Sequence, residues 1–289
     1  METVLELQHV NKSFGDFTLK DVSFSLEKGY IMGFIGANGA GKSTTIRCIL
    51  DLIHADSGEF KLFGENTRGH LADLKQRIGF VFDQDVFFGE LTAERNRRVI
   101  APFYREWDNA AFYKYIRQFD VPLNKKIKNL SKGTKMKFAL AVALSHHAEL
   151  IIMDEPTSGL DPIFRKELLD ILLEVIQDEN KAIFFSTHIT TDLEKVADYI
   201  TFIRDGEIVL SEETEQLLDH YVLIKGPKNL EDEVRKINPI VLSEKALGFE
   251  AFAEAREVKQ IASATNVHLQ RPSLDEIMYY LVKSHKIER

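Results

Sequence analysis

Short apolar runs separated by polar turns dominate the pattern along this chain. Residues 30–35, 150–153 and 182–186 are almost wholly apolar, which is typical of strands buried on both faces of a parallel sheet. Residues 4–10 and 22–26 instead alternate apolar and polar positions, which indicates half-buried strands. The pattern therefore predicts a small antiparallel sheet that precedes a parallel α/β core.

Helical patterns and turn signals divide the rest of the chain. Residues 91–145 are helix-rich, Pro162 opens another helix, and Asp205-Gly206 predicts a hairpin turn. A capping box at Ser273 and Glu276 begins a last helix. We expect an α/β domain over residues 1–210, with a helical subdomain at about 85–148, and a small α+β accessory domain over residues 211–289.

Residues 36–44 carry the clearest chemistry in the sequence. They match the phosphate-binding pattern G-x-x-x-x-G-K-[ST] and lie between a predicted strand and a predicted helix. Glycines let backbone N–H groups surround an anion, Lys42 adds a positive charge, and the Ser43 hydroxyl can hold Mg²⁺. The sequence thus predicts that the chain binds a nucleoside triphosphate. The residues expected to form this loop are Gly36, Asn38, Gly39, Ala40, Gly41, Lys42, Ser43 and Thr44.

Two carboxylates and a histidine follow the predicted core strands. Asp154 and Glu155 end the strand at 150–153, and neighbouring strand residues point in opposite directions. One carboxylate can therefore lie beside a metal held by Ser43, while the other faces an attacking water. His188 follows the strand at 182–186, at the edge where parallel strands open towards a ligand, so it is either a phosphate contact or incidental.

Several weaker candidates keep two interpretations. Ser131 is a good helix N-cap, and with Gly133 it could also bind a second phosphate. Phe14 lies in a predicted loop, where it could stack on an adenine ring or pack into a core. The basic run between Lys125 and Lys137 is typical of a solvated face. Cys48 is the only cysteine, and we interpret it as core packing.

Composition narrows the class of protein. The chain has 289 residues, is 44% apolar and 28% charged, and carries a net charge of −8, which does not favour nucleic acid as a partner. No apolar run approaches the roughly 20 residues that a membrane-spanning helix needs. The acidic N-terminus lacks the features of a signal peptide. We expect a cytoplasmic protein.

In their order along residues 4–210, these motifs resemble the ATPase subunit of an ATP-binding cassette (ABC) transporter, bacterial antibiotic- or peptide-export type. The resemblance implies a P-loop NTPase (RecA-like) core with an antiparallel β subdomain and an α-helical subdomain. It also implies an ATPase that uses ATP and Mg²⁺, energises an integral membrane subunit and lies peripherally on the inner face of the cell membrane. The motifs that carry it are Phe14, the phosphate loop, residues 83–85, Leu130–Thr134, Asp154-Glu155, Ser158–Asp161 and His188.

The resemblance also implies a role for each matching residue. Phe14 stacks on adenine; Lys42, with the backbone of Gly39 and Gly41, holds the outer phosphates. Ser43 and Asp154 hold Mg²⁺. Glu155 polarises the attacking water, and His188 contacts the γ-phosphate. Ser131 and Gly133 contact the nucleotide of a second nucleotide-binding subunit in a head-to-tail homodimer or heterodimer, and Asp161 communicates across that dimer.

Two positions depart from the family pattern. The usual Leu-Ser-Gly-Gly-Gln signature has Lys132 in place of its first glycine and Thr134 in place of its glutamine. The metal-sensing glutamine corresponds to Asp83 in a gapless alignment and to Gln84 after a shift of one residue, and we favour Gln84. The alternative function is a soluble ABC ATPase of cluster assembly, translation or repair. A purely regulatory subunit fits poorly, because Glu155 and His188 are both present.

Overall fold

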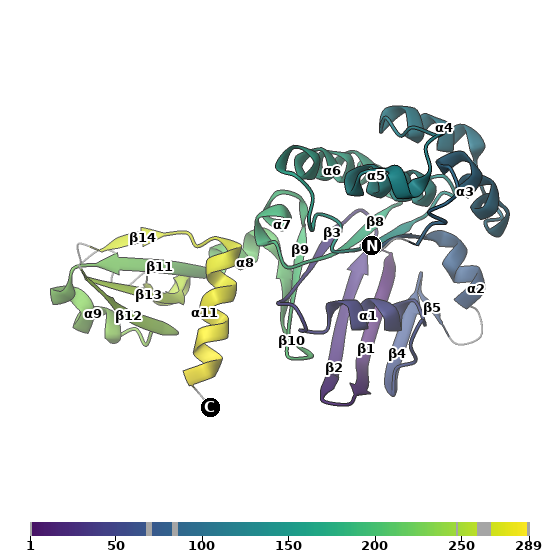
Figure 1. Cartoon of the computed structure of the whole chain (residues 1–289). Helices are drawn as coiled ribbons and strands as arrows, with labels where there is room; N and C mark the ends of the chain where they lie inside the picture. The colour runs from purple at the N-terminus through teal and green to yellow at the C-terminus, as the bar shows by residue number, and fades with distance from the viewer. Residues whose placement is uncertain (1, 68–70, 83–85, 247, 259–266, 288–289) are drawn as a thin grey trace. The chain divides into compact units, whose positions relative to one another are not determined.

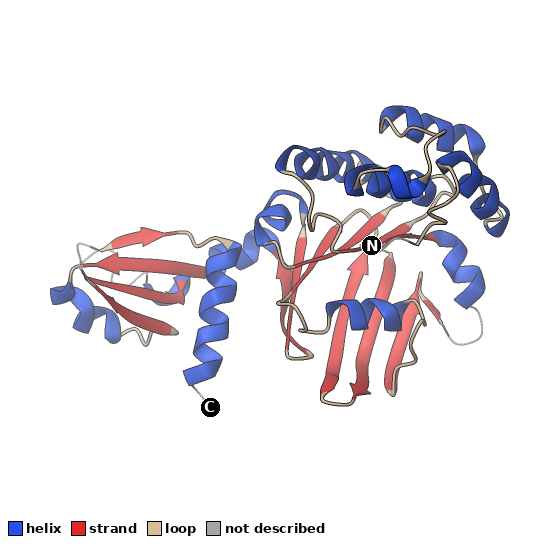
Figure 2. Ribbon diagram, in the orientation of Figure 1, coloured by secondary structure: helices blue, strands red, loops and turns tan. Residues whose placement is uncertain are grey.

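The computed structural model describes residues 2–67, 71–82, 86–246, 248–258 and 267–287. The chain divides into two compact units, Met1–Ser211 and Glu212–Arg289, whereas the expected boundary followed residue 210. The first unit combines two sheets with a group of helices, and the second unit has a sheet of its own (Figures 1 and 2).

The alternating residues near the N-terminus form an antiparallel sheet with the strand order β2-β1-β4-β5. Its strands are β1 (Thr3–Phe14), β2 (Phe17–Glu27), β4 (Ser57–Leu62) and β5 (Glu65–Asn66). Inward-facing residues such as Leu5, Leu7 and Val22 are buried, as the alternation predicts. They share one apolar core with α1 (Lys42–Ile49) and with the second sheet of this unit.

The second sheet has the strand order β10-β9-β3-β8-β7-β6. Strands β6, β7, β8, β3 and β9 pair in parallel in that spatial order, and their apolar side chains are buried on both faces. The bounds are β3 (Ile31–Ile35), β6 (Ile78–Val81), β7 (Leu150–Asp154), β8 (Ala182–Thr187), β9 (Tyr199–Arg204) and β10 (Glu207–Glu213). Parallel pairing brings the carboxyl ends of β3, β7 and β8 to one edge of the sheet.

Helices make up most of the chain between β6 and β7. They are α3 (Ala93–Ile100), α4 (Asn109–Gln118) and α5 (Lys132–Leu144), and the 3₁₀ turns η2 (Ala101–Phe103) and η3 (Ile127–Asn129) lie between them. Buried Asn96 organises the start of this region, because its amide accepts from Phe88 N at 2.9 Å and donates to Phe88 O at 3.1 Å. The other helices of the first unit are α2 (Leu71–Leu74), η1 (Lys75–Arg77), α6 (Pro162–Val175) and α7 (Thr190–Val196).

The second unit follows a β-α-β-β-α-β order with antiparallel strands in the order β12-β13-β11-β14, which is the ferredoxin-like arrangement. Its strands are β11 (Tyr221–Gly226), β12 (Val241–Lys245), β13 (Gly248–Glu254) and β14 (His268–Gln270). Its helices are α8 (Thr214–His220), η4 (Lys228–Leu230), α9 (Glu231–Arg235), α10 (Ala255–Val258) and α11 (Leu274–Ile287).

The last helix begins at the expected capping box. The Ser273 hydroxyl accepts from Glu276 N at 3.3 Å, and the Glu276 carboxylate accepts from Ser273 N at 2.8 Å. On the sheet side, Tyr280 stacks on Phe252 of β13 with ring centroids 5.0 Å apart. Helix α11 therefore covers part of one face of this sheet.

Candidate nucleotide-binding and hydrolysis site

The phosphate loop connects the buried strand β3 to the start of α1. The Lys42 ammonium lies inside the loop and donates to Gly36 O at 2.7 Å and to Ala37 O at 3.2 Å. Lys42 is only 5% exposed, whereas Asn38 and Gly39 face solvent. Ser43 and Thr44 are half-buried in the first turn of α1. The loop thus presents backbone N–H groups and one lysine at a helix N-terminus, a geometry suited to phosphate.

Neighbouring backbone holds the loop in place. Ala40 O accepts from Gly206 N at 3.0 Å, in the turn between β9 and β10. A Cβ on Gly36 would lie 2.4 Å from Ile203 O, closer than two such atoms can approach. Gly36 is therefore required by close packing against β9, in addition to its place in the motif.

The carboxyl ends of β7 and β8 complete a polar cluster beside the loop. Asp154 Oδ1 accepts from the Ser43 hydroxyl at 3.3 Å and from the Ser186 hydroxyl at 2.7 Å. Ser186 is fully buried and pairs with Asp154 in the sheet register. Hydroxyl and carboxylate oxygens are the ligands that Mg²⁺ prefers, so this cluster fits that ion.

Glu155 joins the phosphate loop to His188. Its Oε1 lies 3.1 Å from Lys42 Nζ, and its Oε2 lies 2.8 Å from His188 Nδ1. The side chains of Lys42 and Glu155 are 5% and 15% exposed, whereas that of His188 is 41% exposed. A continuous chain of charged and polar groups therefore runs from the loop to the surface.

The backbone of Glu155 is also unusual. Its φ is 49°, in the left-handed region that costs a non-glycine residue about 1–2 kcal/mol. Strain of this kind gathers at active sites, where the surroundings impose it. Here Ser186 O accepts from Glu155 N at 3.0 Å and fixes the conformation. The two carboxylates have different partners, Ser43 and Ser186 for Asp154 and Lys42 and His188 for Glu155.

The signature residues lie at the N-terminus of α5. The Ser131 hydroxyl accepts from Thr134 N at 3.1 Å, which confirms the predicted helix cap. Gly133 is buried against Phe164 of α6, where a Cβ would lie 2.8 Å from the ring. Asp161 caps α6 by accepting from Ile163 N and Phe164 N. Their roles towards a second subunit stay predictions.

The remaining candidates are also placed by the structure, with one exception. Phe14 ends β1 with 45% of its surface exposed, so it is available for stacking and is not a core residue. Cys48 is buried, as expected. The basic run is only partly a solvated face, because Lys137 is 9% exposed and pairs with Glu167 at 2.7 Å. Asp83 and Gln84 lie outside the described residues.

Sequence reasoning missed the role of Ser186. It orients Asp154 through its hydroxyl, yet serine at the end of an apolar strand has no motif of its own. The only signal in the sequence for this role was the position of Ser186 at the end of a core strand. Parallel strands place Ser186 beside Asp154, once β7 and β8 are known to be neighbours.

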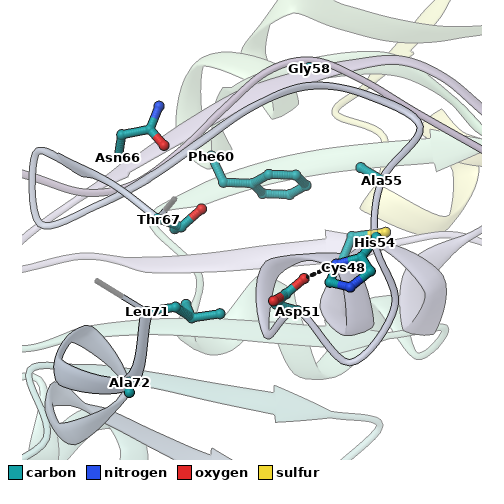
Figure 3. A pocket seen from close by; sticks show the side chains of 10 residues that line it. All are labelled: Cys48, Asp51, His54, Ala55, Gly58, Phe60, Asn66, Thr67, Leu71 and Ala72. Atoms are coloured by element: carbon teal, nitrogen blue, oxygen red, sulfur yellow. Dashed lines mark hydrogen bonds and ion pairs between the residues drawn. The ribbon is translucent and has the colours of Figure 1, made fainter. Parts of the chain in front are cut away.

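A separate cavity of about 490 Å³ lies away from these residues, beside α1, β4 and α2 (Figure 3). Cys48, His54 and Phe60 line part of it, and His54 Nδ1 contacts Asp51 Oδ1 at 2.6 Å. None of the predicted site residues lines this cavity.

Fold and site together define a P-loop nucleotide-binding protein, and comparisons with known proteins assign its family. The ABC transporter family model matches residues 19–158. The bacitracin transport ATP-binding protein BcrA of Bacillus licheniformis is 33% identical over 72% of this chain and 69% of its own length. The lantibiotic transport ATP-binding protein SrtF of Streptococcus pyogenes is 31% identical over 77% of this chain and 99% of its own length.

Solved structures agree with this assignment. The ATP-binding subunit of an ABC transporter is 27% identical, with a TM-score of 0.67 over 74% of this chain and 91% of that chain. A dimeric ATP-binding cassette in a post-hydrolysis state, bound to ADP and Pi, has the same fold, with a TM-score of 0.65. It is 24% identical, and the match covers 73% of this chain and 98% of that cassette. The chain belongs to the ABC transporter family as an ATP-binding, ATP-hydrolysing subunit. This confirms the predicted fold class and ATPase activity.

Proposed function

We propose that this chain hydrolyses ATP to energise a separate membrane-spanning subunit that exports a peptide, an antibiotic or another toxic amphiphile. The transport proteins for bacitracin and for a lantibiotic support this substrate class. The observation that carries the catalytic part is the contact chain from Lys42 through Glu155 to His188. It places a cation, a carboxylate and an imidazole at one edge of the sheet, beside the phosphate loop.

Lys42 would bind the outer phosphates of ATP after a change of partners. An ammonium group has three N–H donors, and three oxygen atoms already surround this one, on Gly36, Ala37 and Glu155. A phosphate oxygen that replaces Glu155 at Lys42 would leave that carboxylate free to accept a proton from water. Substrate binding and exposure of the base are thus linked in one step.

Glu155 would act as the general base, and His188 as its positioning partner and a γ-phosphate contact. The 2.8 Å contact between Oε2 and Nδ1 holds the carboxylate in one orientation, and when the ring carries both protons its other nitrogen can donate to a phosphate oxygen. A positioned base of this kind typically accelerates a reaction by about 10²–10⁴-fold.

Mg²⁺ would be held by Ser43 and Asp154, with Gln84 as a further ligand candidate. When bound, it would neutralise developing charge on the phosphates. Within the described residues there is no group of three or more His, Cys, Asp or Glu side chains that could hold a metal by themselves. Mg²⁺ commonly uses one or two protein ligands together with substrate phosphates, so this donor set is sufficient.

A second nucleotide-binding subunit would complete the site. Ser131 and Gly133 lie at the N-terminus of α5, which has 13 residues, and helix N-termini favour anions. We assign them, with Asp161, to the nucleotide bound by the other subunit of a homodimer or heterodimer. Phe14 would stack on the adenine of its own nucleotide.

The membrane-spanning subunit would dock on the segment between residues 86 and 103. Large apolar side chains are exposed there, among them Phe88 at 58% and Phe103 at 74%. Asn96 ties the backbone of Phe88 to α3, so Phe88 is held at a fixed place beside that helix. Exposed apolar side chains can mark an interaction site. No described helix of this chain is long and apolar enough to cross a membrane. Docking on that subunit would place this chain in the cytoplasm, on the inner face of the cell membrane.

Antibiotic susceptibility tests this function directly. We expect cells whose chromosomal copy carries Lys42→Ala to become more sensitive to bacitracin or a lantibiotic, because the ammonium that binds phosphate is lost. Purified Lys42→Ala should also lose ATP hydrolysis, whereas removal of the exposed Lys125 by Lys125→Ala should change neither result. Unchanged hydrolysis by Lys42→Ala would contradict the ATPase site. Lost hydrolysis with unchanged susceptibility would contradict only the export of these substrates.

A further inference from the structure

Lys132 departs from the family signature, and the structure shows where its side chain goes. It is the first residue of α5, and its neighbour Ser131 caps that helix. Its Nζ and Cδ would lie 3.4 and 3.8 Å from a Cβ placed on Gly159. The side chain therefore reaches Gly159, in the turn that connects Glu155 to α6.

The helix that carries Lys132 is packed tightly against α6. Gly133 contacts the ring of Phe164, as described above, and Lys137 Nζ lies 4.8 Å from the centre of the same ring. Lys137 also pairs with Glu167 at 2.7 Å. These contacts fix the backbone of Lys132 relative to α6, so its side chain meets the turn at a defined place.

The turn that Lys132 reaches is short and hydrogen-bonded. Glu155 O accepts from Ser158 N at 3.1 Å, and Thr157 O accepts from Leu160 N at 3.3 Å. Asp161 then caps α6. Gly159, the contact of Lys132, thus lies between the proposed base and the residue assigned to communication across the dimer.

We propose that Lys132 is a positioning residue, whose ammonium and stem hold the 155–161 turn in the conformation that aims Glu155 at the attacking water. The inference rests on the proposed catalytic role of Glu155 and adds a link from the signature helix to that carboxylate within one chain. Lys132 should therefore act on the rate of hydrolysis and not on the affinity for ATP.

Three variants of the entire chain separate the effect of the Lys132 charge from the effect of its aliphatic side chain. Lys132→Ala removes both, Lys132→Met keeps the stem, and Lys132→Arg keeps the charge. We expect kcat for ATP hydrolysis to fall about fivefold in Lys132→Ala, which corresponds to a rise of about 1 kcal/mol in the barrier. The kcat of Lys132→Met should lie between those of Lys132→Ala and the wild type, and that of Lys132→Arg should be within about twofold of the wild type. KM for ATP should hardly change in any of the three variants.

Amide hydrogen exchange gives a readout that does not need turnover. The amides of Ser158 and Leu160 should exchange about fivefold faster in Lys132→Ala, because the turn opens more often. Lys125→Ala, which removes an exposed lysine of the same basic run, should leave both kcat and these amides unchanged.

The outcomes separate this inference from the proposed function. Wild-type kcat and unchanged exchange in Lys132→Ala would overturn the positioning role while the ATPase stands. A rise in KM with kcat unchanged would overturn it as well, because Lys132 would then act on binding. If the wild-type protein does not hydrolyse ATP, the proposed function fails, and the exchange of Ser158 and Leu160 alone decides whether Lys132 holds the turn.

Discussion

Replacement of Glu155 by glutamine tests the proposed mechanism most directly. Glu155→Gln keeps the size of the side chain and removes the basic oxygen. It also removes the negative charge 3.1 Å from Lys42 Nζ and 2.8 Å from His188 Nδ1. The loop, the Ser43–Asp154 contact and the backbone bond from Glu155 N to Ser186 O do not depend on that charge. The fold of the site should therefore survive.

The expected effects on hydrolysis and on binding have opposite signs. Loss of the base should lower kcat by about 10²–10⁴-fold, which corresponds to roughly 3–5 kcal/mol in the barrier. ATP affinity should stay equal or increase, because the variant removes a carboxylate that competes with phosphate for Lys42 and repels it. The variant should therefore accumulate with ATP bound, as a dimer held together by contacts from both subunits.

Three measurements check this prediction. Phosphate release gives kcat, equilibrium binding of a fluorescent ATP analogue gives affinity, and light scattering with ATP and Mg²⁺ gives the mass of the complex. Glu179→Gln, at an exposed position, is the matched control and should behave as wild type. Near-normal turnover in Glu155→Gln would refute its role as the base. Slow turnover with only monomers present would refute the homodimer but not the role of Glu155 as the general base.

Two further predictions concern the stability of the fold and the packing of the phosphate loop. Burial lowers the pKa of His146 to about 4, below its usual 6.5, against the opposing effect of its contact with Gln76 O. As the pH falls, His146 therefore takes up a proton in the unfolded chain before it does so in the folded chain. The free energy of unfolding should decrease as the pH drops from 6.5 towards 4. The free energy of unfolding should decrease by about 2 kcal/mol between pH 7 and 5 from this group. His146→Phe keeps an aromatic ring against Tyr104 and should lose this component in urea titrations at the two pH values; an equal pH dependence in both proteins would contradict it. Gly36→Ala should abolish ATP binding and lower the melting temperature, because the added Cβ would lie 2.4 Å from Ile203 O; wild-type affinity in equilibrium binding would show that β9 does not confine the loop.

The sequence by itself determined those local structures that are formed by residues close together in the chain. The phosphate loop, the Ser131 cap and the Ser273–Glu276 capping box each need only a few consecutive side chains, and each helix begins where the pattern places it. The Asp205-Gly206 turn is also present, with φ values of 49° and 82°. The order of such motifs along the chain was enough to indicate the family.

Only the tertiary structure decided which distant residues meet. Strand β3 lies between β8 and β9, and β7 lies beside β8, so Ser186 reaches Asp154 and Glu155 reaches both Lys42 and His188. Lys137, predicted on a solvated face, is instead enclosed by Phe164 and Glu167. The sequence does not specify these contacts, because the apolar pattern of a segment indicates only which of its own residues are buried. It does not indicate which other segment packs against them. Strand order and helix packing arise from burial of apolar surface by the whole domain, and they set the distances on which catalysis depends.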